Sequence, residues 1–380
     1  MSEWKEYRLG DICEIFAGGD APKEKYSKLK TNEYNIPIFS NGITDEGLYG
    51  YTDKARVLTP ATTITARGTV GVVFRRKEPY FPIVRLISVI GNKELLDSDF
   101  LYYKLKSTYI DGEGSVQAQL TVPMISNYRI DIPSLEKQRS IASILSSLDD
   151  KIAVNRRICE NLEAQAQALF KHWFIDFAPF KNGQFVESEL GMIPEGWRVG
   201  SPYEYVDFIY GAPYKSNLFN DKKEGLPLIR IRDLKDCSPQ FYTPEILPKT
   251  EYVKAGDVLA GMDAEFAPYI WKGQKGLLNQ RVCKIKPKNT SIGRLFCMLL
   301  VKPQLLFVQA VKTGTTVSHI GKSDIDRFKV VLPPFEDVVK FSTIGEEILE
   351  AIITLSAENQ RLSTLRDSLL PKLMFGQIKV

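Results

Sequence analysis

The sequence has few of the residues on which most catalytic and metal sites depend. Its 380 residues include only two histidines, His172 and His319, so neither a histidine-rich zinc site nor a Ser-His-Asp hydrolase is expected. The five cysteines form no Cys-x-x-Cys pair, and their odd number argues against a complete disulfide framework. We therefore expect a reduced, cytoplasmic protein with packed thiols and no metal site.

The pattern of a membrane protein or a secreted protein is also missing. The most apolar stretch, residues 295–311, is interrupted by Lys302 and Pro303, whereas a span needs roughly 18 apolar residues. The first residues are acidic and basic rather than apolar, so we expect no secretory leader and no membrane contact. With 44% hydrophobic and 25% charged residues, the composition is that of a globular protein, and the length predicts two or three domains.

The chain repeats itself with a period near 190–200 residues. At an offset of 200, residues 129–136 (RIDIPSLE) align with residues 329–336 (KVVLPPFE), and Gly114 aligns with Gly314. At an offset of 193, Trp4 aligns with Trp197 and Gly18 with Gly211. This period is far longer than a solenoid unit, so it indicates two whole domains in tandem, each followed by a helix.

Each half begins with short β-branched segments between glycines and prolines, which predict strands. Short helices are expected at residues 99–106 and 293–301, so each half is α+β. The expected strands lie at residues 62–65, 70–74, 82–90, 228–231 and 280–285. The predicted domains are residues 1–133 and 179–333, separated and followed by helical segments at residues 134–178 and 334–380.

The two helical segments carry apolar residues at alternate spacings of four and three, which is typical of a coiled coil. Each helix could instead pack only on its own domain, but two stripes of about four heptads each favour an intramolecular pair. Connectivity makes that pair antiparallel, and it is expected to hold the two globular domains apart in a pseudo-twofold arrangement. Asn155 and Glu358 are polar positions that would set the register. The first stripe comprises Ile141, Leu145, Leu148, Ile152, Asn155, Cys159, Leu162, Ala166 and Leu169. The second comprises Ile344, Ile348, Ala351, Leu355, Glu358, Leu362, Leu365 and Leu369, and Pro371 is expected to end the helix.

The sequence resembles several catalytic motifs without matching any of them fully. Residues 314–323 end like a P-loop, but six residues separate the glycines where the phosphate cradle needs four. Residues 332–335 (LPPF) resemble the Asn-Pro-Pro-Phe motif of amino-methyltransferases, but leucine has no oxygen to accept a hydrogen bond from the target amine. No pair of catalytic groups remains, so the sequence indicates a binding protein.

Basic residues interleaved with aromatics and glycines indicate a nucleic-acid contact in both halves. Residues 181–333 carry 22 basic and 16 acidic side chains, an excess of 6 basic residues, whereas the excess in the whole chain is 4. Arginine binds guanine bidentately and lysine holds phosphate, which makes these side chains candidates for DNA binding. The candidates are Lys54, Arg67, Arg75, Arg76, Lys215, Arg230, Arg232, Lys272, Lys275 and Arg281.

Long motifs resemble the specificity (S) subunits of type I restriction–modification systems over essentially the whole chain. The most specific are residues 132–152 (IPSLEKQRSIASILSSLDDKI) and 167–177 (QALFKHWFIDF). Further matches are residues 193–197 (IPEGW), 256–259 (GDVL), 278–282 (LNQRV) and 365–373 (LRDSLLPKL). Residues 336–341 (EDVVKF) depart from the usual Glu-x-Gln-x-x-Ile opening of the second helix, which leaves the contacts at that end open.

The resemblance implies a non-catalytic subunit with two target-recognition domains, each reading one half of a split double-stranded DNA sequence. It implies that two modification (methyltransferase) subunits dock on the helices and that restriction (translocase/nuclease) subunits join the complex. S-adenosylmethionine, ATP and Mg²⁺ would act on those partners, with no cofactor on this chain. The helix and partner-binding residues would be Leu145, Leu148, Ile152, Leu162, Leu169, Ile348, Leu355, Leu362 and Leu369. The alternative is a self-contained DNA methyltransferase or nuclease.

Overall fold

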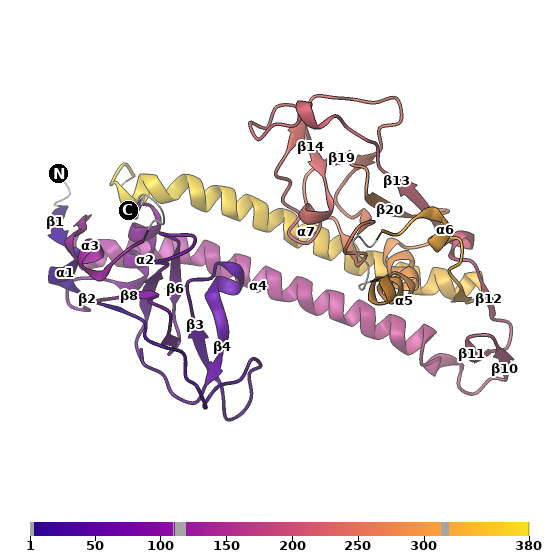
Figure 1. Ribbon diagram of the computed structural model, residues 1–380, viewed down its shortest axis with the longest axis horizontal. Coiled ribbons are helices and arrows are strands. Elements are labelled where there is room, and N and C mark those ends of the chain that lie inside the picture. The colour runs from indigo at the N-terminus through magenta and orange to yellow at the C-terminus, as the bar shows by residue number, and fades with distance from the viewer. Residues whose placement is uncertain (1–3, 109, 111–118, 313–318, 379) are drawn as a thin grey trace. The chain divides into compact units, whose positions relative to one another are not determined.

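The protein is an α+β chain that divides into two compact units. The computed structural model describes residues 4–108, 110, 119–312, 319–378 and 380 (Figure 1). Unit 1 comprises Met1–Ile152 and Arg361–Val380, and unit 2 comprises Ala153–Gln360. Both long helices, α4 (Leu135–Phe174) and α7 (Phe335–Met374), contribute one part to each unit. The predicted α+β class is thus confirmed, whereas the alignment of Gly114 with Gly314 lies outside the described residues.

Unit 1 is built on a four-stranded sheet of order β2-β8-β5-β6 and a three-stranded sheet of order β4-β3-β7. A separate pair, β1 with β9, brings Lys5 opposite Ile132 just before α4 begins. The elements are β1 (Lys5–Arg8), α1 (Leu9–Ile12), β2 (Cys13–Ala17), β3 (Ile36–Phe39), β4 (Leu48–Thr52), β5 (Ala61–Ile64), β6 (Val73–Arg76), β7 (Phe81–Pro82), β8 (Ile87–Gly91), α2 (Ser98–Lys106), α3 (Val122–Asn127) and β9 (Arg129–Ile132), with a 3-10 turn at Thr44–Gly47.

Unit 2 repeats this plan. Its sheets have the orders β13-β20-β17-β18 and β15-β14-β19-β16, and the pair of β12 with β21 precedes α7 as β1 with β9 precedes α4. The hairpin of β10 (Phe185–Ser188) and β11 (Gly191–Pro194) follows α4. The other elements are β12 (Arg198–Gly200), β13 (Val206–Tyr210), β14 (Leu226–Ile229), β15 (Tyr242–Thr243), β16 (Tyr252–Val253), β17 (Val258–Gly261), β18 (Pro268–Ile270), β19 (Gly276–Leu278), β20 (Val282–Pro287), α5 (Arg294–Lys312), α6 (Lys322–Ile325) and β21 (Val330–Leu332), with 3-10 turns at Ala178–Phe180, Pro202–Glu204, Ser216–Leu218 and Ile231–Asp233.

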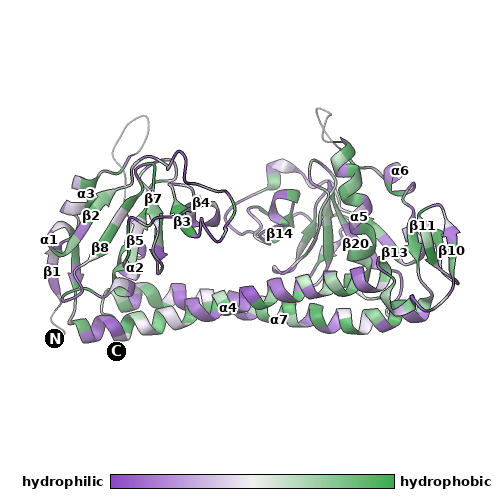
Figure 2. Cartoon of the chain, turned by 90° about the horizontal axis from the view of Figure 1, so that it is seen from below, coloured by the Kyte–Doolittle hydropathy of each residue, from purple (hydrophilic) through white to green (hydrophobic). Residues whose placement is uncertain are grey.

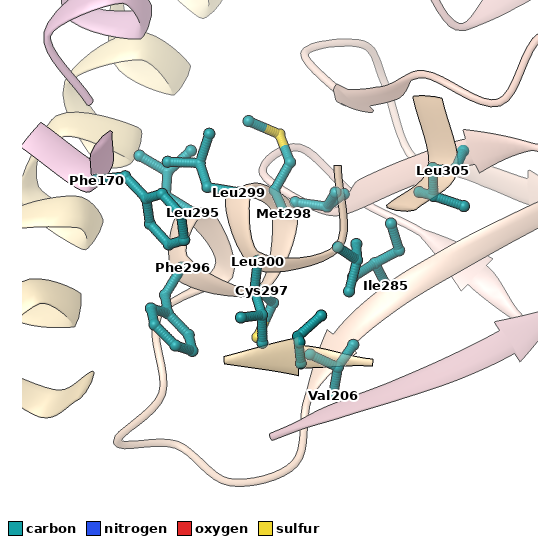
Figure 3. Close-up of a cluster of buried hydrophobic side chains, with 14 of the residues drawn as sticks. Phe170, Val206, Ile285, Leu295, Phe296, Cys297, Met298, Leu299, Leu300 and Leu305 are labelled. Carbon is teal, nitrogen blue, oxygen red and sulfur yellow. The ribbon is translucent and has the colours of Figure 1, made fainter. Parts of the chain in front are cut away.

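The core of unit 2 joins α5 to the sheet and to both long helices. Figure 3 shows Leu295, Phe296 and Leu299 of α5 beside Phe170 of α4 and across from Ile285 of β20. The ring of Phe170 packs edge-on against Phe341 of α7, with centroids 5.6 Å apart. The hydropathy colouring places green residues along α5 and β20 (Figure 2). Removal of this much apolar surface from water is the main driving force for folding of the unit.

Helix α5 is longer than expected and continues through Lys302 and Pro303. Of the helices in the described part of the chain, it has the length and composition of a possible membrane span. However, its segment from Leu295 to Val301 is buried in the core of unit 2, where an apolar helix of a globular domain belongs. The apolar character of α5 therefore reflects its central position within the unit.

The parts of α4 and α7 within each unit pair in antiparallel fashion, as predicted. In unit 2, the Sγ atom of Cys159 lies 3.9 Å from the carbonyl oxygen of Ile352, and Phe174 packs on Phe341. In unit 1, Arg366 forms a 2.6 Å ion pair with Asp149. Along both units, residue numbers on α4 rise as those on α7 fall.

Two details of the predicted second stripe are wrong. Ile344 and Leu365 are 39% and 46% exposed, because the buried face of α7 runs instead through Phe341, Leu349 and Ile352. Pro371 does not end the helix, which continues to Met374. Burial of Leu370, Leu373 and Met374 in the core of unit 1 offsets the hydrogen bond that proline cannot donate.

Candidate nucleic-acid interface

In unit 1, the structure separates the predicted basic residues into free and engaged side chains. Lys54 and Arg67 are exposed on the loops before and after β5, and neither side chain has a hydrogen-bonding partner within the described residues. Arg75 is held by Asp99 of α2, and its Nη1 lies 3.9 Å from Asp150 of α4. Lys54 and Arg67 therefore remain available to a ligand, whereas Arg75 attaches β6 to α2 and α4.

Arg76 has a different environment from its neighbours. It is only 3% exposed; its guanidinium donates to Thr63 Oγ1 at 3.0 Å and to the Glu46 carbonyl oxygen at 2.7 Å. Burial lowers the pKa of Arg76 to about 10, and the Glu46 carboxylate opposes that shift. Arg76 therefore ties β6 to the Thr44–Gly47 turn, and its charge is directed into the protein.

In unit 2, three of the predicted cations stay accessible in loops or beside an aromatic ring. Lys215 and Arg232 are exposed, and the side chain of neither makes a polar contact with the rest of the described chain. The ammonium of Lys275 lies 4.5 Å from the ring centroid of Tyr252. In contrast, Arg230 pairs with buried Asp233, and Lys272 forms a 2.7 Å ion pair with Glu163 of α4.

Arg281 lies in an exposed cluster of three charged or titratable groups. Its Nε is 3.4 Å from Asp263 Oδ2, and its Nη1 is 3.3 Å from His319 Nδ1. His319 Nδ1 is in turn 2.6 Å from Asp263 Oδ1. The cluster offers donors and acceptors side by side at the surface, which suits the edge of a base pair.

Sequence reasoning missed three exposed basic residues of unit 1. Arg85 is exposed on the turn between β7 and β8, and Arg56 lies over the ring of Phe16 at 4.8 Å. Lys28 is placed over the stacked rings of Tyr26 and Tyr49, 4.0 Å from the centroid of Tyr49. An alignment at an offset of 196, which places Arg85 on Arg281, was the signal that could have identified Arg85.

The predicted seam residues of the helices lie in or beside the cores of their units. In unit 1, Leu145 and Ile152 are buried, and Leu369 packs against the core; Leu148 and Leu362 are half-buried. In unit 2, four further seam residues pack partly buried against the main core: Leu162, Leu169, Ile348 and Leu355. Asn155 is fully buried, and its Nδ2 donates to Glu358 Oε2 at 2.7 Å and to Asn359 Oδ1 at 2.9 Å.

Potential catalytic chemistry is limited in the part of the chain that the structure describes. Within it, no group of three or more histidine, cysteine or acidic side chains is arranged to hold a metal ion. A cleft of about 750 Å³ in unit 2 is lined by lysines, including Lys254, Lys286 and Lys288. Its carboxylates are engaged in ion pairs: Asp257 with Lys284, and Glu346 with Arg294. The cleft is therefore suited to an anion rather than to acid–base catalysis.

Comparison with known proteins identifies similar sequences along the whole chain. A family model described as the type I restriction modification DNA specificity domain matches residues 1–164 and 194–366. The specificity subunit of the type I restriction enzyme MjaIX of Methanocaldococcus jannaschii is 28% identical over 418 residues, covering 100% of this chain and 94% of that protein. The HindI specificity subunit of Haemophilus influenzae is 22% identical over 471 residues, covering 100% of both chains.

A solved structure shares the fold. The crystal structure of the S subunit of a type I restriction–modification system from M. genitalium superimposes with a TM-score of 0.60 at 16% identity. The match covers 98% of this chain and 96% of that one. The arrangement of elements described above is thus shared with a protein whose sequence has diverged widely.

Proposed function

The chain belongs to the family of type I restriction–modification DNA specificity proteins, and from this premise we propose that each of its two units binds one half of a bipartite DNA target. Such a protein selects the sequence and leaves the chemistry to other subunits. The observation that carries the proposal is the duplication of one sheet plan in the two units, each with unpaired basic side chains at its surface. Phosphate contacts by such cations position a protein, and contacts with base edges specify the sequence.

We propose that the exposed apolar side chains of the long helices receive the partner subunits. Val154 and Ile158, four residues apart on α4, are 46% and 39% exposed, although both lie on a helix that packs in the core of unit 2. Residues four apart lie on one face of a helix, so these two form a continuous apolar strip. The partners would be two modification subunits carrying S-adenosylmethionine, joined by restriction subunits carrying ATP and Mg²⁺, in the cytoplasm.

The partner proposal is tested by the double variant Val154→Asp with Ile158→Asp. We expect loss of co-purification with the modification subunits while the thermal midpoint of the chain changes little, because both positions are exposed. Arg157→Asp, at an exposed polar position of the same helix, serves as the matched control and should leave the complex intact. Normal assembly of the double variant would contradict this docking surface.

The DNA proposal is tested by binding and methyl transfer at several salt concentrations. The complex with modification subunits should bind specific duplex DNA with an affinity that falls steeply as salt rises, since phosphate contacts release counterions. The chain alone, incubated with labelled S-adenosylmethionine and DNA, should transfer no methyl group. Methyl transfer by the isolated chain would favour a self-contained enzyme, and binding insensitive to salt would favour a protein-binding scaffold.

A further inference from the structure

The turn between β7 and β8 in unit 1 holds two ordinary residues in a backbone conformation that favours glycine. The N–H of Leu86 donates to the Ile83 carbonyl at 3.1 Å, closing a four-residue turn. Its central residues, Val84 and Arg85, have φ values of +52° and +64°. Positive φ at both central positions is usually supplied by Asn-Gly, and for a β-branched residue such as Val84 it is a genuine outlier. The turn is therefore strained, and both of its central side chains are exposed.

The surrounding backbone holds this turn in place. The N–H groups of Val84 and Arg85 donate to the carbonyls of Gly19 at 2.8 Å and Gly18 at 3.1 Å. The side chain of Asn41 donates to the Val84 carbonyl and accepts from the N–H of Ala66 at 2.7 Å. A Cβ on Gly18 would meet the Ile83 nitrogen at 2.7 Å, so the close approach requires glycine. Asn41 thus fixes the strained turn beside the loop that begins with Arg67.

Unit 2 contains a turn in the equivalent place, with a positive φ at its second central residue only. The N–H of Val282 donates to the Asn279 carbonyl at 3.1 Å, and Arg281 has a φ of +73°. The N–H of Gln280 donates to the Ala212 carbonyl at 2.8 Å, as Val84 does to Gly19. The isolated parallel bridges Gly19↔Ile83 and Ala212↔Asn279 confirm the correspondence, which places Arg85 on Arg281.

An arginine therefore occupies the position that favours glycine in both turns, and both side chains are exposed. Strain of this kind is costly and is characteristic of functional sites. Glycine would relieve the strain. If the arginine served only the folded chain, its contacts within the chain would have to offset that strain. The Arg85 guanidinium has no partner within the described residues, and that of Arg281 contacts only the half-buried Asp263 and the exposed His319 there. The contacts of the two arginines within the described chain therefore do not explain why strained positions carry arginine.

We propose that Arg85 and Arg281 are equivalent base-reading residues, each binding a guanine in one half of the target. This inference rests on the proposed function. An arginine on a rigid, strained turn is pre-organised for the bidentate contact with guanine O6 and N7 in the major groove. The loop after the neighbouring strand differs between the units, with Arg67 in unit 1 where unit 2 has Asp263. Both residues lie three positions past a strand residue, Ile64 or Ala260, that pairs with one of the first residues of β8 or β20. Equivalent positions of the two units therefore present different side chains, so we expect the two half-sites to differ.

The test uses the complex of the full chain with its modification subunits and a library of randomised duplexes. Arg85→Gly should reduce the preference for one guanine in one half-site by about 5- to 150-fold, the discrimination of a good bidentate contact, and leave the other half-site unchanged. Arg281→Gly should have the reciprocal effect. Since glycine suits both turns, the thermal midpoints should be unchanged or higher. Arg129→Ala and Arg198→Ala, at exposed arginines of β9 and β12, are matched controls and should leave both half-sites unchanged.

The outcomes separate this inference from the proposed function. Uniformly weaker binding to all sequences by the glycine variants would indicate phosphate contacts and overturn the base-reading role. If both glycine variants kept the wild-type base preference, the base-reading role of the arginines would also be overturned. The proposed function would stand, because the complex would still prefer one sequence. A wild-type complex with no preference at any position would contradict the proposed function itself.

Discussion

The side chain of Asn155 on α4 donates a hydrogen bond from Nδ2 to Oε2 of Glu358 on α7 over 2.7 Å. Asn155 is completely buried and also donates to Asn359, so a polar layer interrupts the apolar contact between the two helices of unit 2. The two hydrogen bonds from Asn155 Nδ2 form only when these residues are opposite each other. The layer therefore favours one register of the helix pair over the neighbouring ones.

Replacing Asn155 with Leu should destabilise unit 2. The change removes the two hydrogen bonds to Glu358 and Asn359, and an intramolecular hydrogen bond contributes about 0.5–1.5 kcal/mol net. Urea unfolding followed by circular dichroism measures the loss. Arg156→Leu, at the exposed adjacent position, is the control and should have little effect. An Asn155→Leu variant as stable as the wild type would show that the polar layer does not contribute.

Replacing Leu162 with Asp should disrupt the same helix pair more severely. Leu162 packs partly buried against the core of unit 2, so its replacement loses part of the about 2–5 kcal/mol of a fully buried leucine and also places a carboxylate in an apolar environment. We expect a lower thermal midpoint and loss of assembly with modification subunits. Gln165→Asp introduces the same charge at an exposed site on the helix and should be tolerated. Retained assembly and unchanged modification in Leu162→Asp would contradict the seam.

Arg294, at the start of α5, should be essential for attaching that helix to α7. It forms ion pairs of 2.6 Å with Glu346 and 2.5 Å with Glu350. Charge-assisted hydrogen bonds contribute about 1.5–3 kcal/mol each, so Arg294→Ala should lower the unfolding free energy measurably. Arg294→Lys keeps the charge but not the planar fork and should be intermediate. Equal stability of Arg294→Ala and the exposed-site control Lys249→Ala would argue against this attachment.

All five cysteines should resist alkylation in the folded protein. Burial raises the pKa of Cys13 to about 12 and also raises the pKa of Cys283 and Cys297. Burial likewise raises the pKa of Cys159 and Cys237. Because the thiolate is the nucleophile, iodoacetamide at pH 8 should label the unfolded chain five times and the native chain hardly at all. Rapid labelling of the native chain, detected by mass spectrometry, would contradict the packed environment of the thiols.

The same pKa shifts predict a decline of stability in alkaline solution. An unfolded thiol ionises near pH 8.5, whereas the folded thiols hold their protons to higher pH. The unfolded state therefore binds fewer protons than the folded state above pH 8.5, and the free energy of unfolding falls as the pH rises. Urea midpoints measured between pH 7 and pH 10 should decrease, and substitution of Cys13 by Ser should reduce the slope.

The long helices could be predicted from the sequence to within about four residues at their ends, whereas the buried face of α7 could be predicted only in part. The absence of proline and glycine from residues 134–172 predicted α4, which runs from Leu135 to Phe174. In α7, apolar residues occupy more than one stripe, so the heptad pattern alone could not decide between Ile344 and Phe341. The core of unit 2 selects Phe341, because the aromatic rings of α4 and α5 pack there.

The site was harder to predict because its geometry depends on strain that the sequence does not display. Residues 82–90 look like one strand, but the chain turns between Ile83 and Leu86 and only then enters β8. Neither Val84 nor Arg85 is a residue that favours such a turn. Tertiary hydrogen bonds to the carbonyls of Gly18 and Gly19 and from the side chain of Asn41 impose it, and these partners are distant in the sequence. In contrast, Arg281 was identified among the basic residues, although its contacts with Asp263 and His319 were not.

The most direct test of the central claim is sequencing of methylated positions in genomic DNA from a host that expresses this chain with its modification subunits. Reading by two units predicts two short specified blocks of different sequence, separated by a fixed number of unspecified base pairs. Methylation in both blocks should disappear when this chain is omitted. A single uninterrupted motif, or a motif that persists without the chain, would contradict the account.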